Sequence, residues 1–110
     1  VPVCLVGHTH LPTAFRLAGS DDAADGAPVV AVPRKGLRTI EVDASQRWII
    51  NPGSVGQPRE GDPRASFSVL DLADGTVAWE RVAYDTASAQ DRAINAGLPA
   101  RTAERLAVGA

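Results

Sequence analysis

The stretch Val3-Cys4-Leu5-Val6-Gly7-His8-Thr9-His10 decides the fold of this chain. Its first five residues, 3–7, are apolar on both faces, which predicts a short strand that is fully buried in its sheet. The stretch ends in two histidines, the only two among 110 residues. Because α/β proteins usually present a site where a buried strand ends, we expect the functional residues to begin here.

The composition is that of one ordinary globular domain, with 45% apolar and 22% charged residues. The net charge of −2 gives no basic footprint, so we expect no nucleic-acid or membrane partner. No run approaches the ~18 apolar residues of a membrane span. The single cysteine, Cys4, is expected to be a buried small side chain and fits a reducing, cytoplasmic setting. The chain begins at Val1 directly before a strand, which predicts a fragment.

The order of elements is mostly strands followed by two helices. Asp74-Gly75 between two alternating segments predicts a hairpin, and Asp85 and Gly97 are typical of the start and stop of a helix. The expected strands are 3–7, 13–17, 29–32, 38–43, 47–50, 65–72 and 76–83, and the helices are 86–96 and a last one that begins at 98–99. The predicted class is α/β, α+β-like as a fragment, with a mostly antiparallel or mixed sheet and two carboxyl-terminal helices over one face.

The two histidines form a candidate metal site. On an extended segment, side chains two residues apart point the same way, so His8 and His10 would face one space. They lie ~6–7 Å apart along a strand, and each would more easily hold one ion of a pair ~3.5–4 Å apart than share one ion. Gly7 leaves room for other backbone or a metal-bridging group. The alternative is that they are merely polar residues at a strand end.

Other ligands for such a site are scarce in this sequence. Cys4 lies four strand residues from His8, about 13 Å away, which argues against a shared metal. Three aspartates lie at 21–25, but they read as part of a solvated loop. A catalytic zinc needs about three protein ligands, and a pair of metals needs more. The histidines therefore predict an incomplete site.

Two motifs make the interpretation more specific. Residues 7–12 resemble the last metal-binding motif of the calcineurin-like metallophosphoesterases. Residues 51–59, with 62–67 after them, resemble the segment that follows in the small bacterial phosphodiesterase branch. The ending at 82–106 is similar to that branch's carboxyl end, and an extra loop stands at about 19–36.

The resemblance implies a four-layer αββα sandwich, two mixed sheets with helices outside. Residues 1–110 would be the carboxyl-terminal portion of one such domain, with its upstream half absent. It implies two divalent ions (Mn, Fe, Ni or Zn), with His8 on one and His10 on the other. The implied reaction is hydrolysis of a small phosphorylated substrate by a metal-bridging hydroxide.

The family's remaining ligands and its general acid are absent here. The resemblance therefore places no catalytic residue in this chain, and we expect the isolated chain to be inactive. Apolar surface left bare would favour self-association into a homo-oligomer. The alternative is a non-catalytic protein-interaction scaffold on the same fold, although retention of both histidines argues against it.

The loop at 51–59 has two interpretations. In the first, Asn51, Ser54 or Arg59 contacts substrate, and the Arg59 guanidinium is suited to binding a phosphate. Alternatively, Asn-Pro-Gly-Ser is a turn that ends a strand and crosses between sheets. The sequence favours the turn for Asn51 and Ser54 and leaves Arg59 open.

Overall fold

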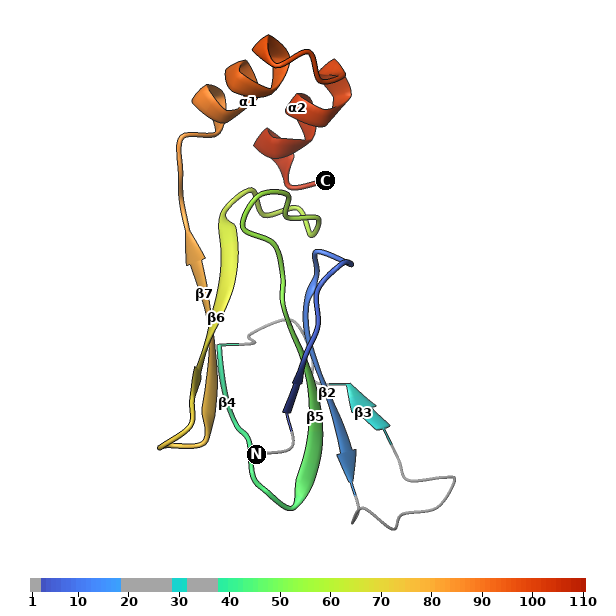
Figure 1. The fold of residues 1–110 in the computed structure, drawn as a ribbon, viewed down its shortest axis with the longest axis vertical. Helices are drawn as coiled ribbons and strands as arrows, with labels where there is room; N and C mark the ends of the chain where they lie inside the picture. The colour runs from blue at the N-terminus through green and yellow to red at the C-terminus, as the bar shows by residue number, and fades with distance from the viewer. Residues whose placement is uncertain (1–2, 19–28, 32–37) are drawn as a thin grey trace.

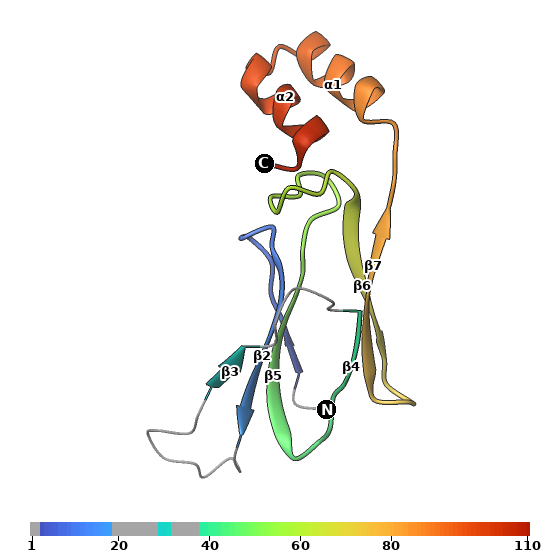
Figure 2. The ribbon, with the colours of Figure 1, turned by 180° about the vertical axis from the view of Figure 1, so that it is seen from behind.

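The protein was analysed as a computed structural model that describes residues 3–18, 29–31 and 38–110. Two β-sheets face each other, and a pair of helices stands at one end of them (Figures 1 and 2). Sheet A has the strand order β1 (Val3–Leu5), β5 (Gln46–Pro52), β2 (Pro12–Ala18), β3 (Val29–Ala31). Sheet B has the order β4 (Thr39–Glu41), β7 (Thr76–Val82), β6 (Ala65–Asp71). β1 pairs with β5 in parallel and the other pairs are antiparallel, which confirms the predicted mixed fold.

The core lies between the two sheets. Alternation along β5 buries Trp48 and Ile50 on the inner face and leaves Ile49 exposed on the outer face. In sheet B, Val77 and Trp79 face inward together, because residues two apart on a strand share one face. The buried cluster consists of Ala14, Val42, Trp48, Ile50, Val77 and Trp79. Hydrogen bonds also cross between the sheets. Trp79 Nε1 on β7 donates to the Asn51 carbonyl on β5 at 3.0 Å, and Ser66 Oγ on β6 donates to the Pro52 carbonyl on β5 at 2.7 Å.

The first strand is not buried as the sequence predicted. Cys4 is exposed, and Leu5 retains 61% of its accessible surface. β1 is the edge strand of sheet A and pairs only with β5. Its register with β5 places Cys4 on the outer face and Leu5 on the inner face, so within the described residues neither face is covered at this end of the strand. Apolar residues on both faces of a strand indicate that each face is suited to packing against another element. They do not show whether the chain itself provides that element.

The two helices form where the sequence placed them. α1 (Thr86–Asn95) begins after Asp85, whose side chain accepts from the Ser88 amide at 3.0 Å. It is followed by Gly97 at φ 79°, a conformation that favours glycine. α2 (Ala100–Val108) follows directly.

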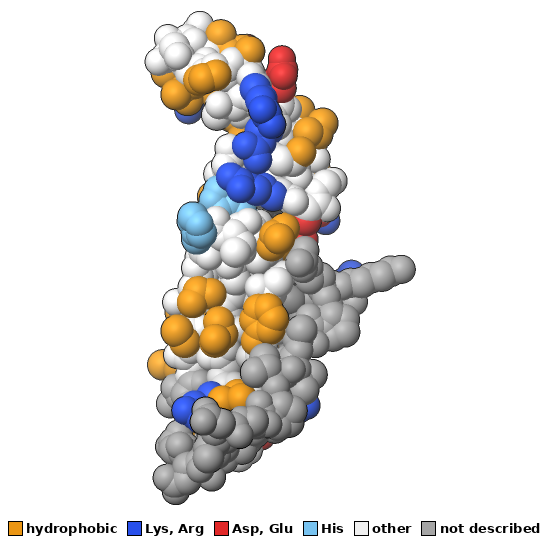
Figure 3. Space-filling model, turned by 90° about the vertical axis from the view of Figure 1, so that its right-hand side faces the viewer, with side chains coloured by type: hydrophobic (Ala, Val, Ile, Leu, Met, Phe, Trp, Pro, Cys, Tyr) orange, Lys and Arg blue, Asp and Glu red, His pale blue; other side chains and the backbone are white. Residues whose placement is uncertain are grey.

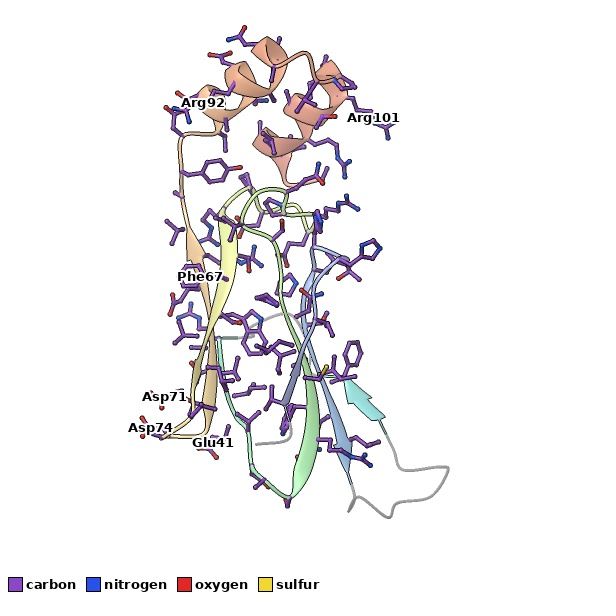
Figure 4. The ribbon with its side chains drawn as sticks, in the orientation of Figure 1. Glu41, Phe67, Asp71, Asp74, Arg92 and Arg101 are labelled. Atoms are coloured by element: carbon purple, nitrogen blue, oxygen red, sulfur yellow. The ribbon has the colours of Figure 1, made fainter. Side chains whose placement is uncertain are left out.

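The helices do not cover a sheet face, which corrects the predicted arrangement. They pack against each other beyond the sheet ends (Figure 1), and Ala103 alone is buried among their described residues. The outer face of sheet B stays open, with Phe67 pointing away from the core (Figure 4). The radius of gyration is 16.8 Å, against ~13 Å for a compact chain of about this size. None of the described helices has the length and apolar character needed to cross a membrane.

The bond from Trp79 to Asn51 gives a test with a built-in control. Trp79→Phe is expected to lower the free energy of unfolding by about 1–3 kcal/mol more than Trp48→Phe. Both indoles are buried, but Trp79 Nε1 donates to Asn51, whereas Trp48 Nε1 has no partner among the described residues. Urea unfolding of the two variants measures the difference. Equal losses would mean that the Trp79–Asn51 bond contributes nothing to stability.

Candidate metal centre

The histidines lie in a turn beyond β1, not on the strand itself. β1 ends at Leu5, and both His8 (φ 72°) and His10 (φ 62°) have left-handed backbone. His8 and His10 therefore do not lie on an extended segment, and the prediction that such a segment points both side chains the same way is wrong. Such a conformation costs a non-glycine residue of order 1–3 kcal/mol and gathers at functional sites, and histidine is among the residues that adopt it more often. Two such residues in one short turn indicate a backbone shaped for a site.

Asn51 holds this turn in place from the end of β5. Its side chain is buried, and Nδ2 donates to the Gly7 carbonyl and to Thr9 Oγ1, each at 3.0 Å. Its Oδ1 accepts from the Gly53 amide at 2.9 Å. Because both amide protons of Asn51 already donate within the chain, these contacts favour Asn51 as part of the turn that ends β5 over Asn51 as a substrate contact. Thr9 lies between the two histidines, so the clamp acts on the turn that presents them.

His10 is oriented by a backbone carbonyl. Its Nδ1 lies 2.8 Å from the Gln57 carbonyl oxygen, which can only accept. Nδ1 is therefore assigned the proton, and a neutral imidazole keeps its lone pair on Nε2. This is the usual arrangement around a metal-ligating histidine, whose second nitrogen donates to a carbonyl or carboxylate. His10 is thus half-buried and prepared to bind through Nε2.

His8 is held less firmly. Its side chain is exposed and, among the described residues, no hydrogen bond to it is found. A Cβ added to Gly7 would meet no described atom within 4 Å, so the close approach expected at this glycine is not made by this part of the chain. The Gly7 carbonyl accepts from Thr9 at 2.9 Å as well as from Asn51. Gly7 therefore contributes through its carbonyl.

The loop after β5 meets the histidine turn at Gln57. Ser54 Oγ accepts from the Gln57 amide at 2.9 Å and shapes the bend that turns the Gln57 carbonyl toward His10. Arg59 is exposed, and its guanidinium donates to Gln57 Oε1 at 3.0 Å. One residue thus links His10 to Arg59. The role of Gln57 could not be predicted from its residue type, because its contact with His10 is made by the backbone.

The described residues bring the two motifs together but do not complete a metal site. Figure 3 shows both histidines at the surface with basic side chains beside them. Nowhere in 3–18, 29–31 or 38–110 do three His, Cys, Asp or Glu side chains gather as metal ligands would. The aspartates at 21–25 lie outside the described residues. This part of the chain therefore offers two imidazoles as metal ligands. That Asn51, Ser54 or Arg59 contacts substrate remains a prediction.

Comparison with known proteins agrees with the two motifs. No family model matches the chain. It is 34% identical over 104 residues to the uncharacterized protein MJ0912 of Methanocaldococcus jannaschii, a match that spans 94% of this chain and 38% of that protein. The crystal structure of a metallophosphoesterase from Sphaerobacter thermophilus is 40% identical and superimposes with a TM-score of 0.78, covering 100% of this chain and 43% of that one.

These similarities confirm the resemblance to the metallophosphoesterases. The chain has the fold of part of such a protein and spans less than half the length of either relative. That it corresponds to the carboxyl-terminal portion, and to the small bacterial phosphodiesterase branch, stays a prediction.

Proposed function

We propose that His8 and His10 each supply one ligand to a pair of divalent metal ions in a phosphoesterase. The observation that carries this proposal is the 2.8 Å contact between His10 Nδ1 and the Gln57 carbonyl. It leaves Nε2 free to bind, as a metal-ligating histidine requires. The strained turn around Thr9 and its clamp by Asn51 support the same function.

The residues present fit a metal of this kind. Imidazole suits zinc, iron and nickel and accepts manganese, so the donor set does not select among them. Bound divalent ions would supply Lewis acidity and lower the pKa of water at the site. Asn51 would keep the turn in place, Gln57 would fix the His10 tautomer, and Arg59 would grip a phosphoryl oxygen.

The whole protein would then hydrolyse a phosphate ester. The remaining ligands and the general acid would come from sequence outside this chain, consistent with its coverage of 43% of the solved metallophosphoesterase. The scaffold alternative has no specific observation in its favour, since a protein without metal chemistry has no need for the His10–Gln57 arrangement.

The test compares this chain with the full-length gene product. With manganese and an aryl phosphate, the 110-residue chain is expected to show only background hydrolysis, because two imidazoles are too few for two metals. The full-length product is expected to turn over and to lose that activity in EDTA. Turnover by the short chain that His8→Ala abolishes would contradict the first expectation. A full-length product with no metal-stimulated hydrolysis would favour the scaffold.

A further inference from the structure

A column of basic side chains continues from the histidines toward the helices (Figure 3). The residues that the contacts place along this face are Arg59 in the loop after β5, and Arg105 and Arg101 on α2; we call them the arginine stripe. Arg59 and Arg101 are exposed and Arg105 is half-buried. None of the three is needed for the fold's core.

The contacts along the stripe fix its position relative to the histidines. Arg59 is tied to His10 through Gln57. The same loop packs against the end of α2, where the Gly61 amide donates to the Gly109 carbonyl at 2.8 Å. A Cβ added to Gly109 would lie 2.6 Å from the Asp62 carbonyl oxygen, so the packing here is backbone against backbone. The loop and α2 are therefore in direct contact.

The two helical arginines extend the line away from the site. Arg101 and Arg105 are four residues apart, so they lie on one face of α2. The helix rises ~1.5 Å per residue, which sets their Cα atoms about 6 Å apart along its axis. Arg101 lies on the far side of the helix pair from Arg92 (Figure 4).

Among the described residues, no carboxylate forms an ion pair with Arg59 or Arg101. The acids of the loop are already paired, Asp62 with Arg64 at 2.6 Å and Glu60 with Arg81. The Arg64 hydrogen bond lowers the pKa of Asp62 to about 2, so Asp62 stays ionised within that pair. In the part of the chain that the structure describes, no Asp or Glu side chain pairs with the three stripe arginines.

The stripe arginines differ in the partners that they do have. Arg59 meets the neutral Gln57 side chain, whereas Arg105 Nε donates at 2.6 Å to an oxygen of Ala110, which at the end of this chain belongs to the terminal carboxylate. Figure 3 shows an acidic side chain beside the upper end of the basic column. Further acidic side chains lie at the opposite end of sheet B, where Figure 4 labels Glu41, Asp71 and Asp74. A protein of net charge −2 thus presents a local positive track beside its candidate metal site.

From this geometry we infer that the arginine stripe binds further phosphate groups of the substrate. The substrate class is a linear oligophosphate or its ester, with one phosphoryl group at the histidines and the next ones along Arg59, Arg105 and Arg101. Guanidinium groups suit phosphate oxygens because they present several donors in a fixed plane. None of the stripe residues is aromatic, so the base stacking that a single-stranded nucleic acid uses is not provided. The assignment of the histidine end rests on the proposed function, but the stripe itself does not need a metal.

The test measures binding of inorganic tripolyphosphate and of orthophosphate to the 110-residue chain in EDTA, by calorimetry at low salt. Tripolyphosphate is expected to bind more tightly than orthophosphate. The double variant Arg101→Gln, Arg105→Gln is expected to weaken tripolyphosphate binding about tenfold, the effect of losing roughly one charged hydrogen bond. The matched control Arg92→Gln removes the same charge from α1 and is expected to change binding less than about twofold.

Several outcomes would overturn the inference. They are no preference for tripolyphosphate, an equal loss in the Arg92→Gln control, or tighter binding of a single-stranded DNA oligomer with the same dependence on Arg101 and Arg105. In the metal-loaded full-length product, the double variant is expected to raise KM for an oligophosphate ester and to leave hydrolysis of an aryl phosphate unchanged. If the 110-residue chain in EDTA does not bind tripolyphosphate, the inference about the stripe is wrong. If the full-length product shows no metal-dependent hydrolysis of an aryl phosphate, the proposed function is wrong.

Discussion

His10→Ala in the full-length gene product is expected to lower kcat for phosphate ester hydrolysis by at least about 10³-fold, because a metal supplies several kcal/mol of transition-state stabilisation. His8→Ala is expected to have a similar effect through the other ion. His10 is the better positioned of the two, since Gln57 already orients its ring. Steady-state kinetics at saturating manganese measures both losses.

Gln57→Ala is the matched control for these variants. It keeps the backbone carbonyl that accepts from His10 and removes only the side-chain contact with Arg59. Its kcat is expected to stay within about threefold of the unaltered protein, an effect of less than 1 kcal/mol. A His10→Ala protein that retained more than a tenth of its activity would mean that His10 binds no essential metal.

Asn51→Ala is expected to weaken metal binding about 10- to 100-fold, as loss of a group that orients a ligand typically does. Its buried amide makes three hydrogen bonds, to Gly7, Thr9 and Gly53, which together hold the histidine turn on the end of β5. The free energy of unfolding should also fall, by about 1–3 kcal/mol, because the Gly53 amide loses its side-chain partner and the Gly7 carbonyl loses one of its two donors.

Asn51→Asp separates the two roles of this side chain. An ionised aspartate can still accept from the Gly53 amide but cannot donate to the Gly7 carbonyl. It is therefore expected to restore part of the stability and little of the metal affinity. Metal titration and urea unfolding of the two variants give both quantities. An Asn51→Ala protein with unchanged metal affinity would show that the turn holds its shape without the clamp.

The elements with local signals were predictable from sequence. The hairpin at Asp74-Gly75 needs only a turn residue that accepts positive φ, and Gly75 has φ 63°. Asp85 and Gly97 mark the limits of α1 through contacts within a few residues. Where the helices would pack was not predictable, because short helices with little buried surface do not specify which face they cover.

The candidate site was predictable in its residue types and not in its shape. A histidine pair beside glycine signals metal chemistry, but the left-handed backbone at His8 and His10 depends on Asn51, more than 40 residues away. The role of Gln57 had no signal in its side chain. The exposure of β1 likewise depends on which elements cover it, and alternation along the strand cannot show that.

The metal content of the full-length gene product tests the central claim most directly. After equilibration with manganese and removal of free ions, mass spectrometry is expected to find two ions per chain in the unaltered protein and one or none in His8→Ala and in His10→Ala. Each histidine would then account for a ligand of a different ion, as the proposed centre requires. Two ions retained in both variants would contradict the assignment of His8 and His10 as metal ligands.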